Sequence, residues 1–473
     1  MASTSIWWIR RDLRLSDNQA LSAAIQTSQQ VIPVFIVDPF LVDSARTGPK
    51  RLAFLWGGLH ILEQALRQRG SYLVVRSGIP EVVLKSLFEE TGTEKIYAQA
   101  DFSAYARKRD KKVSKKLPVA LVGSSGFSHP ERILKKDGSP YTVFTPYKKR
   151  WMAEMHSLLD RLAPAPETIQ TPELIKGETL PGHNLSQYNL PFKPGEMEAK
   201  KRLGKFTESD RISEYGQFRN RMDLPGTSQL SPYLRFGMIS SQQAVQSAIE
   251  KMGSFSRMEA KKGAETWLNE LVWRDFYISI LYHYPDVMNR SFRANLRDIA
   301  WVNNRWEFER WCEGQTGFPV VDAGMRQLVQ TGWMHNRARM ITASFLVKDL
   351  LVDWRWGEGW FMKHLIDGDP AANNGGWQWT AGTGTDAAPY FRIFNPTTQG
   401  LKFDPKGDYV RKWVTELNNV PTKYIHTPWE MSAEIQNQVG CRIGVDYPER
   451  IIDHKFARQR TLDVYNKAKV DRS

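Results

Sequence analysis

Short apolar runs rich in Val and Ile recur through the first 123 residues. They lie at residues 5–12, 30–38, 71–78, 94–101 and 118–123. Helical patterns separate them, such as residues 51–70, where we expect Gly70 to cap the helix. This alternation is typical of a parallel sheet covered by helices. It predicts an α/β domain over residues 1–130. No G-x-G-x-x-G follows the first run, which argues against a nicotinamide dinucleotide site there.

The pattern changes in the second part of the chain. Residues 131–200 are richer in Pro, Gly, Thr and Glu, which is typical of a connector. After residue 200 the β-branched runs largely disappear, and apolar residues recur at helical spacing. We therefore predict three parts: an α/β domain over 1–130, a connector over 131–200 and an all-α domain over 201–473.

The segment from Trp267 to Gly400 contains eleven of the 17 tryptophans. In it, Glu270 and Arg274 stand four residues apart beside Trp273, and Asn336 and Met340 also stand four residues apart. Most tryptophans on helices belong to the core, and a Glu among apolar residues usually pairs with a nearby Arg. The combination of a carboxylate, an amide, a thioether and several indoles nevertheless suits a cavity for a planar, partly polar ligand such as a nucleobase or a flavin.

Composition limits the class of protein. The formal net charge of +14 favours a polyanionic partner, most commonly nucleic acid, although a run such as residues 107–116 is more often a solvated helix face. Cys312 and Cys441 are too few for a disulfide framework or a cysteine metal site, and we expect no metal. No apolar run is long enough to span a membrane and no secretory leader is visible, so we expect a soluble, cytoplasmic protein of bacterial or archaeal type.

Several long segments, in order, closely resemble the photolyase/cryptochrome family, in particular its class I cyclobutane pyrimidine dimer photolyases. They are residues 7–18, 141–151, 227–237, 267–277, 332–354 and 366–400. The resemblance extends from Trp7 to about Trp429. It implies a Rossmann-like α/β domain and an all-α FAD-binding domain. It also implies a monomeric, light-driven enzyme that repairs pyrimidine dimers in DNA.

The resemblance implies a set of FAD-binding residues. Small hydroxyls before Pro232 suit a phosphate cradle, although without the resemblance a simple helix N-cap is the more common explanation. Arg339 is expected to pair with Asp367 beside the flavin ring, and Asn373 to face flavin N5. The implied FAD-binding residues are Tyr215, Thr227, Ser228, Gln229, Leu230, Ser231, Trp267, Arg339, Asp367, Gly368, Asp369 and Asn373.

The resemblance also implies how the lesion is held once it is flipped out of the duplex. Glu270 and Asn336 would hydrogen-bond the pyrimidine edges, Trp273 and Trp379 would stack on the dimer, and Met340 would complete the pocket. Enzymes for the 6-4 photoproduct carry histidines around the helix where this chain has Asn336 and Met340, which favours cyclobutane dimers. The implied DNA-contacting residues are Arg219, Glu270, Trp273, Arg274, Tyr277, Asn336, Arg337 and Gln399.

Two further features follow from the resemblance alone. Trp377, Trp354 and Trp301 match a chain of tryptophans that carries electrons to oxidised flavin. Arg51, Asp101 and Arg235 resemble residues around a second, light-harvesting chromophore. We expect an 8-hydroxydeazaflavin-type molecule there, with FMN next. Folate is disfavoured because Tyr105-Ala106 replaces the Asn-Glu pair of folate-binding relatives, and an empty pocket is a further alternative.

Two other functions remain open from the sequence. One is a cryptochrome-type blue-light photoreceptor, which the short C-terminus and the set of Glu270, Asn336, Asn373 and Met340 disfavour. The other is a DNA-binding flavoprotein without repair activity, such as a regulator.

Overall fold

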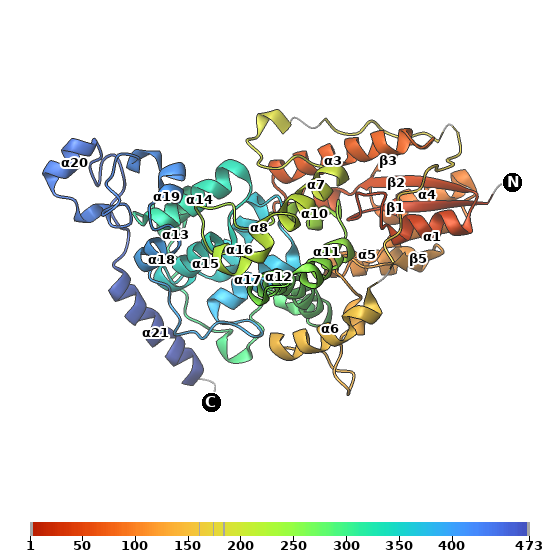
Figure 1. Cartoon of the computed structure of the whole chain (residues 1–473). Coiled ribbons are helices and arrows are strands. Elements are labelled where there is room, and N and C mark those ends of the chain that lie inside the picture. Colours follow the sequence, from red (N-terminus) through yellow and green to blue (C-terminus); the bar gives the residue numbers. More distant parts are fainter. Residues whose placement is uncertain (1–2, 160, 174, 183–184, 471–473) are drawn as a thin grey trace. The chain divides into compact units, whose positions relative to one another are not determined.

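The computed structural model describes residues 3–159, 161–173, 175–182 and 185–470 (Figure 1). The chain packs as two compact units. Unit 1 contains residues 1–216, 228–285 and 366–371. Unit 2 contains residues 217–227, 286–365 and 372–473.

A five-stranded parallel sheet forms the centre of the first half of unit 1. Its strands are β1 Thr4–Ile9, β2 Gln30–Val37, β3 Val74–Ser77, β4 Lys95–Gln99 and β5 Val119–Val122. The order is β3-β2-β1-β4-β5, so successive strands extend the sheet from β1 to one side and then to the other. Ile6, Ile32, Val34, Val74 and Ile96 are buried, as expected when helices cover both faces of a parallel sheet. The predicted α/β domain is confirmed.

All five predicted strands are present, but most end before the predicted residue. The reason lies in aspartates that follow the strands. Asp12, Asp38 and Asp101 each accept a hydrogen bond from a backbone N–H two residues away, which turns the chain out of the sheet.

Helices of unit 1 cover the sheet and continue beyond it (Figure 1). The predicted helix over 51–70 runs from Pro49 to Arg67, and the prediction that Gly70 caps it is wrong. Gln68 is the C-cap, and Gly70 lies in the turn that follows, with a φ of 77°. The longer helices are α1 Gln19–Thr27, α3 Pro49–Arg67, α4 Pro80–Thr91, α5 Ala104–Ser114, α6 Phe144–Leu158, α7 Glu196–Thr207, α10 Ser231–Phe236, α11 Ser241–Ser254 and α12 Met258–His283.

The segment predicted as a connector is not irregular throughout. Helix α6 lies inside it, and α7 begins before residue 200. Tyr147, Trp151 and Met155 recur every four residues on α6 and are buried, a helical pattern that the abundance of Pro and Gly elsewhere in the segment hid. Residues 160, 174, 183 and 184 of the segment lie outside the described residues.

Unit 2 is built of helices, which confirms the predicted helical C-terminal part. A π-helical turn, Phe345–Asp349, follows directly on α15. Helices α10 to α12 pack with unit 1, so the predicted limit at residue 200 does not coincide with the division between the units. The longer helices are α13 Arg305–Glu313, α14 Pro319–Thr331, α15 Asn336–Ser344, α16 Trp354–His364, α17 Pro370–Ala381, α18 Pro396–Phe403, α19 Asp408–Trp413, α20 Ala433–Val439 and α21 His454–Val470.

Tryptophans make up much of the core of unit 2. Trp311, Trp354 and Trp377 are each at most 2% exposed. Gly357 on α16 allows the closest approach, because a Cβ there would lie 2.1 Å from the indole of Trp377. The expectation that most tryptophans are core residues is confirmed for these three.

Lys348 lies inside this core, in the π-helical turn. It is 1% exposed, and its Nζ donates to the carbonyl oxygen of Ala381, at the end of α17, over 3.0 Å. Burial lowers the pKa of Lys348 to about 7.

This pKa predicts how stability changes with pH. Between about pH 7 and pH 10 the folded chain holds a neutral Lys348 amine while the unfolded chain is protonated, so the free energy of unfolding should rise with pH in that window. Replacing Lys348 by Met should flatten the rise and add about 1 kcal/mol near pH 7. Denaturant titrations across the window measure both effects. An unchanged slope in Lys348→Met would contradict the assignment.

Candidate functional site

Helix α12 in unit 1 carries four of the predicted lesion-contacting residues. Glu270, Trp273, Arg274 and Tyr277 are spaced three and four residues apart, so they share one side of this helix. The helical arrangement predicted for residues 267–277 is confirmed.

Trp273 already has one aromatic partner. Its ring stacks on Phe144 of α6, with 3.6 Å between centroids and 4° between planes, and its edge meets Tyr277 at 5.5 Å. Phe144 therefore covers one face of the indole and leaves the opposite face for a base. The sequence analysis missed Phe144, although it lies in the segment over 141–151 that carries the family resemblance.

Arg274 is held inside unit 1. Its guanidinium donates to Ser241 Oγ over 3.0 Å and to the carbonyl oxygen of Leu234 over 3.3 Å. Burial lowers its pKa, Arg11 adds to this effect, and Asp369 opposes it. These bonds favour a structural role, and its contact with DNA phosphate stays a prediction.

Helix α15 in unit 2 brings Asn336 and Met340 together. Asn336 Nδ2 lies 3.8 Å from Met340 Sδ, so the predicted four-residue spacing places the amide and the thioether side by side. Asn336 is exposed and Met340 is half-buried, which leaves the pair accessible to a ligand.

His335 caps this helix, a role that the sequence analysis missed. The ring is 4% exposed, and its Nδ1 accepts from the backbone N–H of Arg337 over 3.1 Å. Burial lowers the pKa of His335 to about 4, and the nearby Arg337 and Arg339 lower it further. The imidazole is therefore neutral at physiological pH and serves to orient the start of α15.

Two of the predicted DNA-contacting arginines lie close together in unit 2. Arg337 donates to Asn220 Oδ1 over 2.7 Å and lies over the ring of Phe403. Burial lowers the pKa of Arg337 to about 10, and repulsion from Arg219 contributes. Two guanidiniums that repel each other form a site where an anion such as a phosphate is stabilised.

Asn373 on α17 is oriented by a carboxylate that the sequence analysis did not identify. Its Nδ2 donates to Glu358 Oε1 over 2.9 Å and to the Glu358 carbonyl over 3.0 Å. Glu358 lies on α16 and is 2% exposed. Because the amide nitrogen is committed to Glu358, Asn373 presents its oxygen, a hydrogen-bond acceptor, to a ligand.

A second group of predicted flavin residues lies in unit 1. Trp267 Nε1 donates to Ser228 Oγ over 3.3 Å, and Phe206 packs between Trp267 and Tyr215 with centroids 5.1 and 5.9 Å away. Gln229 has a φ of 52°, and its side chain accepts from an arginine of α7. Leu230 is the N-cap of α10, and no side chain caps this helix, so the alternative of a hydroxyl N-cap is wrong.

A cluster of buried charges lies beyond the carboxyl ends of β1 and β4. Arg11 Nη2 lies 2.5 Å from Asp369, and Arg11 Nη1 lies 3.6 Å from Asp101. Arg235 Nε donates to the carbonyl oxygen of Gly368 over 2.7 Å. Burial lowers the pKa of Arg235 to about 9, and Arg11 and Arg51 add to the effect while Asp369 and Asp101 oppose it. The predicted antenna residues thus belong to one cluster with Gly368 and Asp369, and the sequence analysis missed Arg11.

The three predicted electron-carrying tryptophans belong to unit 2. Trp354 and Trp377 lie in its main core, and the half-buried Trp301 packs against this core and against a smaller cluster around Tyr465. Trp377 meets Phe361 at 4.9 Å and Trp311 at 6.1 Å. The structure therefore gathers the three indoles around one core, with two aromatic rings that the sequence analysis did not assign.

Other predicted residues are located but their roles stay predictions. Arg339 Nε donates to the carbonyl oxygen of Met334 over 2.8 Å, and its pairing with Asp367 would join the two units. Trp379 is half-buried on α17, and Gln399 is half-buried on α18.

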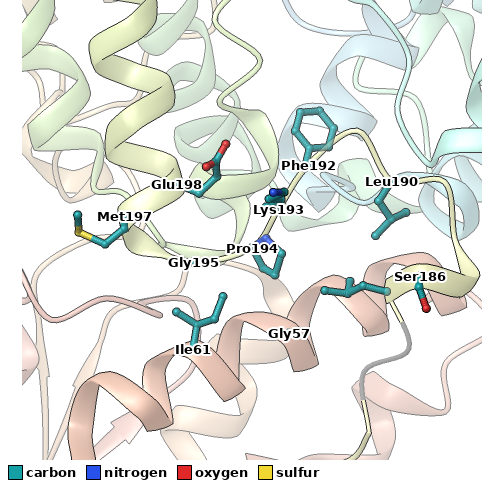
Figure 2. A pocket seen from close by; sticks show the side chains of 11 residues that line it. Gly57, Ile61, Ser186, Leu190, Phe192, Lys193, Pro194, Gly195, Met197 and Glu198 are labelled. Carbon is teal, nitrogen blue, oxygen red and sulfur yellow. The ribbon is translucent and has the colours of Figure 1, made fainter. Parts of the chain in front are cut away.

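A cavity of about 660 Å³ lies elsewhere in unit 1, between α3 and residues 185–198 (Figure 2). Ile61 projects toward it from α3, and Leu190 and Phe192 line the opposite side. The residues that line it include none of the predicted site residues. The cavity therefore does not contribute to the candidate site.

Two structural searches of the described residues are negative. None of the helices in the described ranges combines the length and apolar character that a membrane span requires. Across the same ranges, no group of three or more His, Cys, Asp and Glu side chains is arranged to hold a metal ion.

Comparison with known proteins identifies the family. Residues 5–170 match the family model described as DNA photolyase, and residues 267–467 match the FAD binding domain of DNA photolyase. A deoxyribodipyrimidine photo-lyase of Alkalihalophilus pseudofirmus is 39% identical over 97% of this chain and 97% of its own. A bacterial class III photolyase from Agrobacterium tumefaciens has a TM-score of 0.92 at 37% identity, covering 99% of this chain and 98% of that one. An archaeal photolyase from Sulfolobus tokodaii with two FAD molecules has a TM-score of 0.82 at 31% identity, covering 98% of this chain and 100% of that one. Similarity of this extent shows that the chain belongs to the photolyase/cryptochrome family, with a DNA photolyase domain and a FAD-binding domain.

Proposed function

We propose that this protein is a light-driven DNA repair enzyme that splits cyclobutane pyrimidine dimers, and that it acts as a class I enzyme. The observation that carries the proposal is similarity over the full chain to curated deoxyribodipyrimidine photo-lyases, 39% identical over 97% of its length in the Alkalihalophilus pseudofirmus case. The class is the finer part of the proposal, because a class III photolyase has a closely similar structure.

The side chains suit FAD as the cofactor. Uncapped backbone N–H groups at the start of α10, next to Ser228 and Gln229, suit the pyrophosphate, and Trp267 and Tyr215 offer aromatic surface to the ring system. Asn373 offers a hydrogen-bond acceptor to a protonated ring nitrogen. When bound, reduced and excited by light, FAD supplies one electron to the dimer and receives it back.

The role of Glu358 gives a first test. Replacing Glu358 by Leu removes the carboxylate that orients Asn373, so the amide can rotate and its oxygen no longer stays fixed toward the ligand. We expect the bound flavin to be oxidised by air severalfold faster in Glu358→Leu than in Glu358→Gln, which keeps an acceptor. Absorbance of oxidised flavin after chemical reduction measures this rate, and equal rates in both variants would argue against the orienting role.

The chain's own residues supply the lesion pocket. Asn336 and Met340 lie side by side on α15, so a polar edge and an apolar edge of a flipped dimer can be held next to each other. On α12, Trp273 has one free face for stacking, and Glu270 is the hydrogen-bonding partner that we assign to the pyrimidine edge. Stacking and hydrogen bonding together orient the dimer and exclude water from it.

Arg219 and Arg337 are proposed to hold a phosphate that flanks the lesion. Replacing Arg337 by Ala should weaken binding to damaged and undamaged DNA alike and reduce the salt dependence of log K by about 0.9, the release of about one counterion. Fluorescence anisotropy over a series of salt concentrations measures the slope. Lys402→Ala, on α18, is a control for loss of one positive charge. A selective loss for damaged DNA in Arg337→Ala would contradict a phosphate contact.

We also propose a second chromophore that carries a negative charge, at the cluster of Arg11, Arg51 and Arg235. Strand order reverses between β1 and β4, and ligands of open α/β sheets bind outside the carboxyl ends at such a point. The positive charges there exceed the carboxylates of Asp101 and Asp369, which favours an anionic ligand. An 8-hydroxydeazaflavin-type molecule or FMN meets this requirement.

The lesion class is tested by binding in the dark. Short duplexes that carry one cyclobutane thymine dimer, one 6-4 photoproduct or no lesion are compared by gel shift. We expect clear preference for the cyclobutane dimer. Equal affinity for all three would contradict the proposed pocket.

A further inference from the structure

Aromatic rings continue from Trp301 toward the surface of unit 2. The ring of Tyr465, on α21, meets Trp301 with centroids 6.1 Å apart and an angle of 86°. Tyr465 is 0% exposed and stacks on Tyr390, with centroids 6.0 Å apart and planes 6° from parallel. Tyr390 is half-buried, and its hydroxyl donates to Asn466 Oδ1 over 2.8 Å. Three rings in succession thus connect a core indole with the solvent-facing side of α21.

A buried amine lies over the middle ring. Lys348 Nζ is 3.7 Å from the centroid of Tyr465. The hydroxyl of Tyr465 and the amine of Lys348 both donate to the carbonyl oxygen of Ala381, over 2.8 and 3.0 Å. A phenol that can lose a proton and an amine that can gain one therefore converge on one oxygen atom.

The charged groups around this pair are accounted for. Asp349 receives a hydrogen bond from His454 Nδ1 over 2.5 Å, and Arg460 of α21 donates to the Asp349 carbonyl over 2.6 Å. Asp353, at the start of α16, raises the pKa of the Tyr465 phenol further after burial has raised it. Burial is the cause of the lowered pKa of Lys348, which makes a neutral amine accessible near neutral pH.

We propose that Tyr465 is a redox-active tyrosine, which gives an electron to oxidised Trp301 and its phenolic proton to the amine of Lys348, and that Tyr390 connects it to reductants at the surface. This inference rests on the proposed role of Trp377, Trp354 and Trp301 as electron carriers.

The step balances in electrons, protons and charge. The oxidant is the photoexcited oxidised flavin, which withdraws one electron through the tryptophans and leaves a cation radical at Trp301. Tyr465 then supplies one electron to Trp301, its O–H bond breaks, and a new N–H bond forms on Lys348. The positive charge moves from Trp301 to the ammonium of Lys348, and a neutral tyrosyl radical remains. A surface thiol supplies the electron and proton that restore Tyr465.

The state of Lys348 controls the step. A neutral amine accepts the phenolic proton. An ammonium cannot accept it, and its charge above the ring opposes removal of an electron from Tyr465. The yield of tyrosyl radical should therefore rise with pH through about 7, the pKa of Lys348.

The experiment uses the FAD-loaded protein with oxidised flavin, illuminated and followed by electron paramagnetic resonance and transient absorption. It compares about pH 6 with about pH 9, on either side of the Lys348 pKa. We expect a tyrosyl radical in the wild type, mostly at the higher pH. Tyr465→Phe should show a tryptophanyl radical at both pH values, with severalfold faster recombination. Lys348→Met should lose the pH dependence together with most of the tyrosyl signal.

Control variants separate this inference from the proposed electron path. Tyr390→Phe should keep the tyrosyl signal of Tyr465 but slow its reduction by an added thiol. If the wild type forms only a tryptophanyl radical, and Trp301→Phe abolishes it, the electron path stands and the role of Tyr465 is overturned. If radical formation is unchanged in Trp301→Phe, the electron path fails and the extension fails with it. A tyrosyl radical that persists in Tyr465→Phe would also overturn the inference.

Discussion

Replacing Glu270 by Leu is expected to lower the affinity for DNA that contains a cyclobutane dimer by about 10- to 100-fold, which corresponds to about 1.4–2.8 kcal/mol. The leucine leaves a polar pyrimidine edge without a partner once the dimer has left water. Affinity for undamaged DNA should change little, because Glu270 is proposed to contact the lesion and not the phosphates. Titrations of both DNAs in the dark give the two affinities.

The matched control is Glu270→Gln, which keeps the size of the side chain and its ability to donate and accept. We expect it to retain most of the preference for the lesion. If both variants bind damaged DNA as tightly as the wild type does, the proposed hydrogen bond between Glu270 and the lesion does not exist.

Replacing Trp377 by Phe is expected to slow light-driven reduction of oxidised flavin by at least about 10-fold, a barrier increase of about 1.4 kcal/mol or more. Phenylalanine is much harder to oxidise than tryptophan, so the first step of the electron path is lost. Repair by protein that has been reduced chemically should continue, because that reaction does not use the tryptophans. Loss of the oxidised flavin absorbance under blue light with added thiol measures the rate.

Trp311 provides the control for this variant. Its ring also lies 6.1 Å from that of Trp377 and is fully buried, but it is not part of the proposed path. Trp311→Phe should therefore perturb packing in the same core while light-driven reduction continues. Reduction at the wild-type rate in Trp377→Phe, or equal losses in both variants, would contradict the assigned path.

Local spacing predicted much of what the structure contains. Apolar runs bounded by polar residues gave the five strands, and four-residue spacing placed Asn336 beside Met340. These features depend on the period of the helix and the strand, which neighbouring residues determine. The helix over 144–158 escaped because its apolar positions lie between stretches rich in Pro and Gly.

The supporting side chains escaped for a different reason. Arg11 meets Asp369, a residue 358 positions away in the sequence, and Phe144 meets Trp273 across two helices. Glu358 reaches Asn373 from another helix, where it reads as one more acidic residue. Such contacts depend on tertiary packing, and no periodicity within a segment records them. A family resemblance suggested the main site residues but not the residues that orient them.

The most direct test of the central claim is loss of a single cyclobutane thymine dimer from a short duplex. The FAD-loaded protein is first reduced, then illuminated with near-ultraviolet or blue light, and intact bases are quantified by chromatography. We predict that the dimer disappears in the light and persists in the dark control, and that loss is slower in Glu270→Leu. Persistence of the dimer in the light, with reduced FAD bound and DNA bound, would contradict the assignment as a repair enzyme.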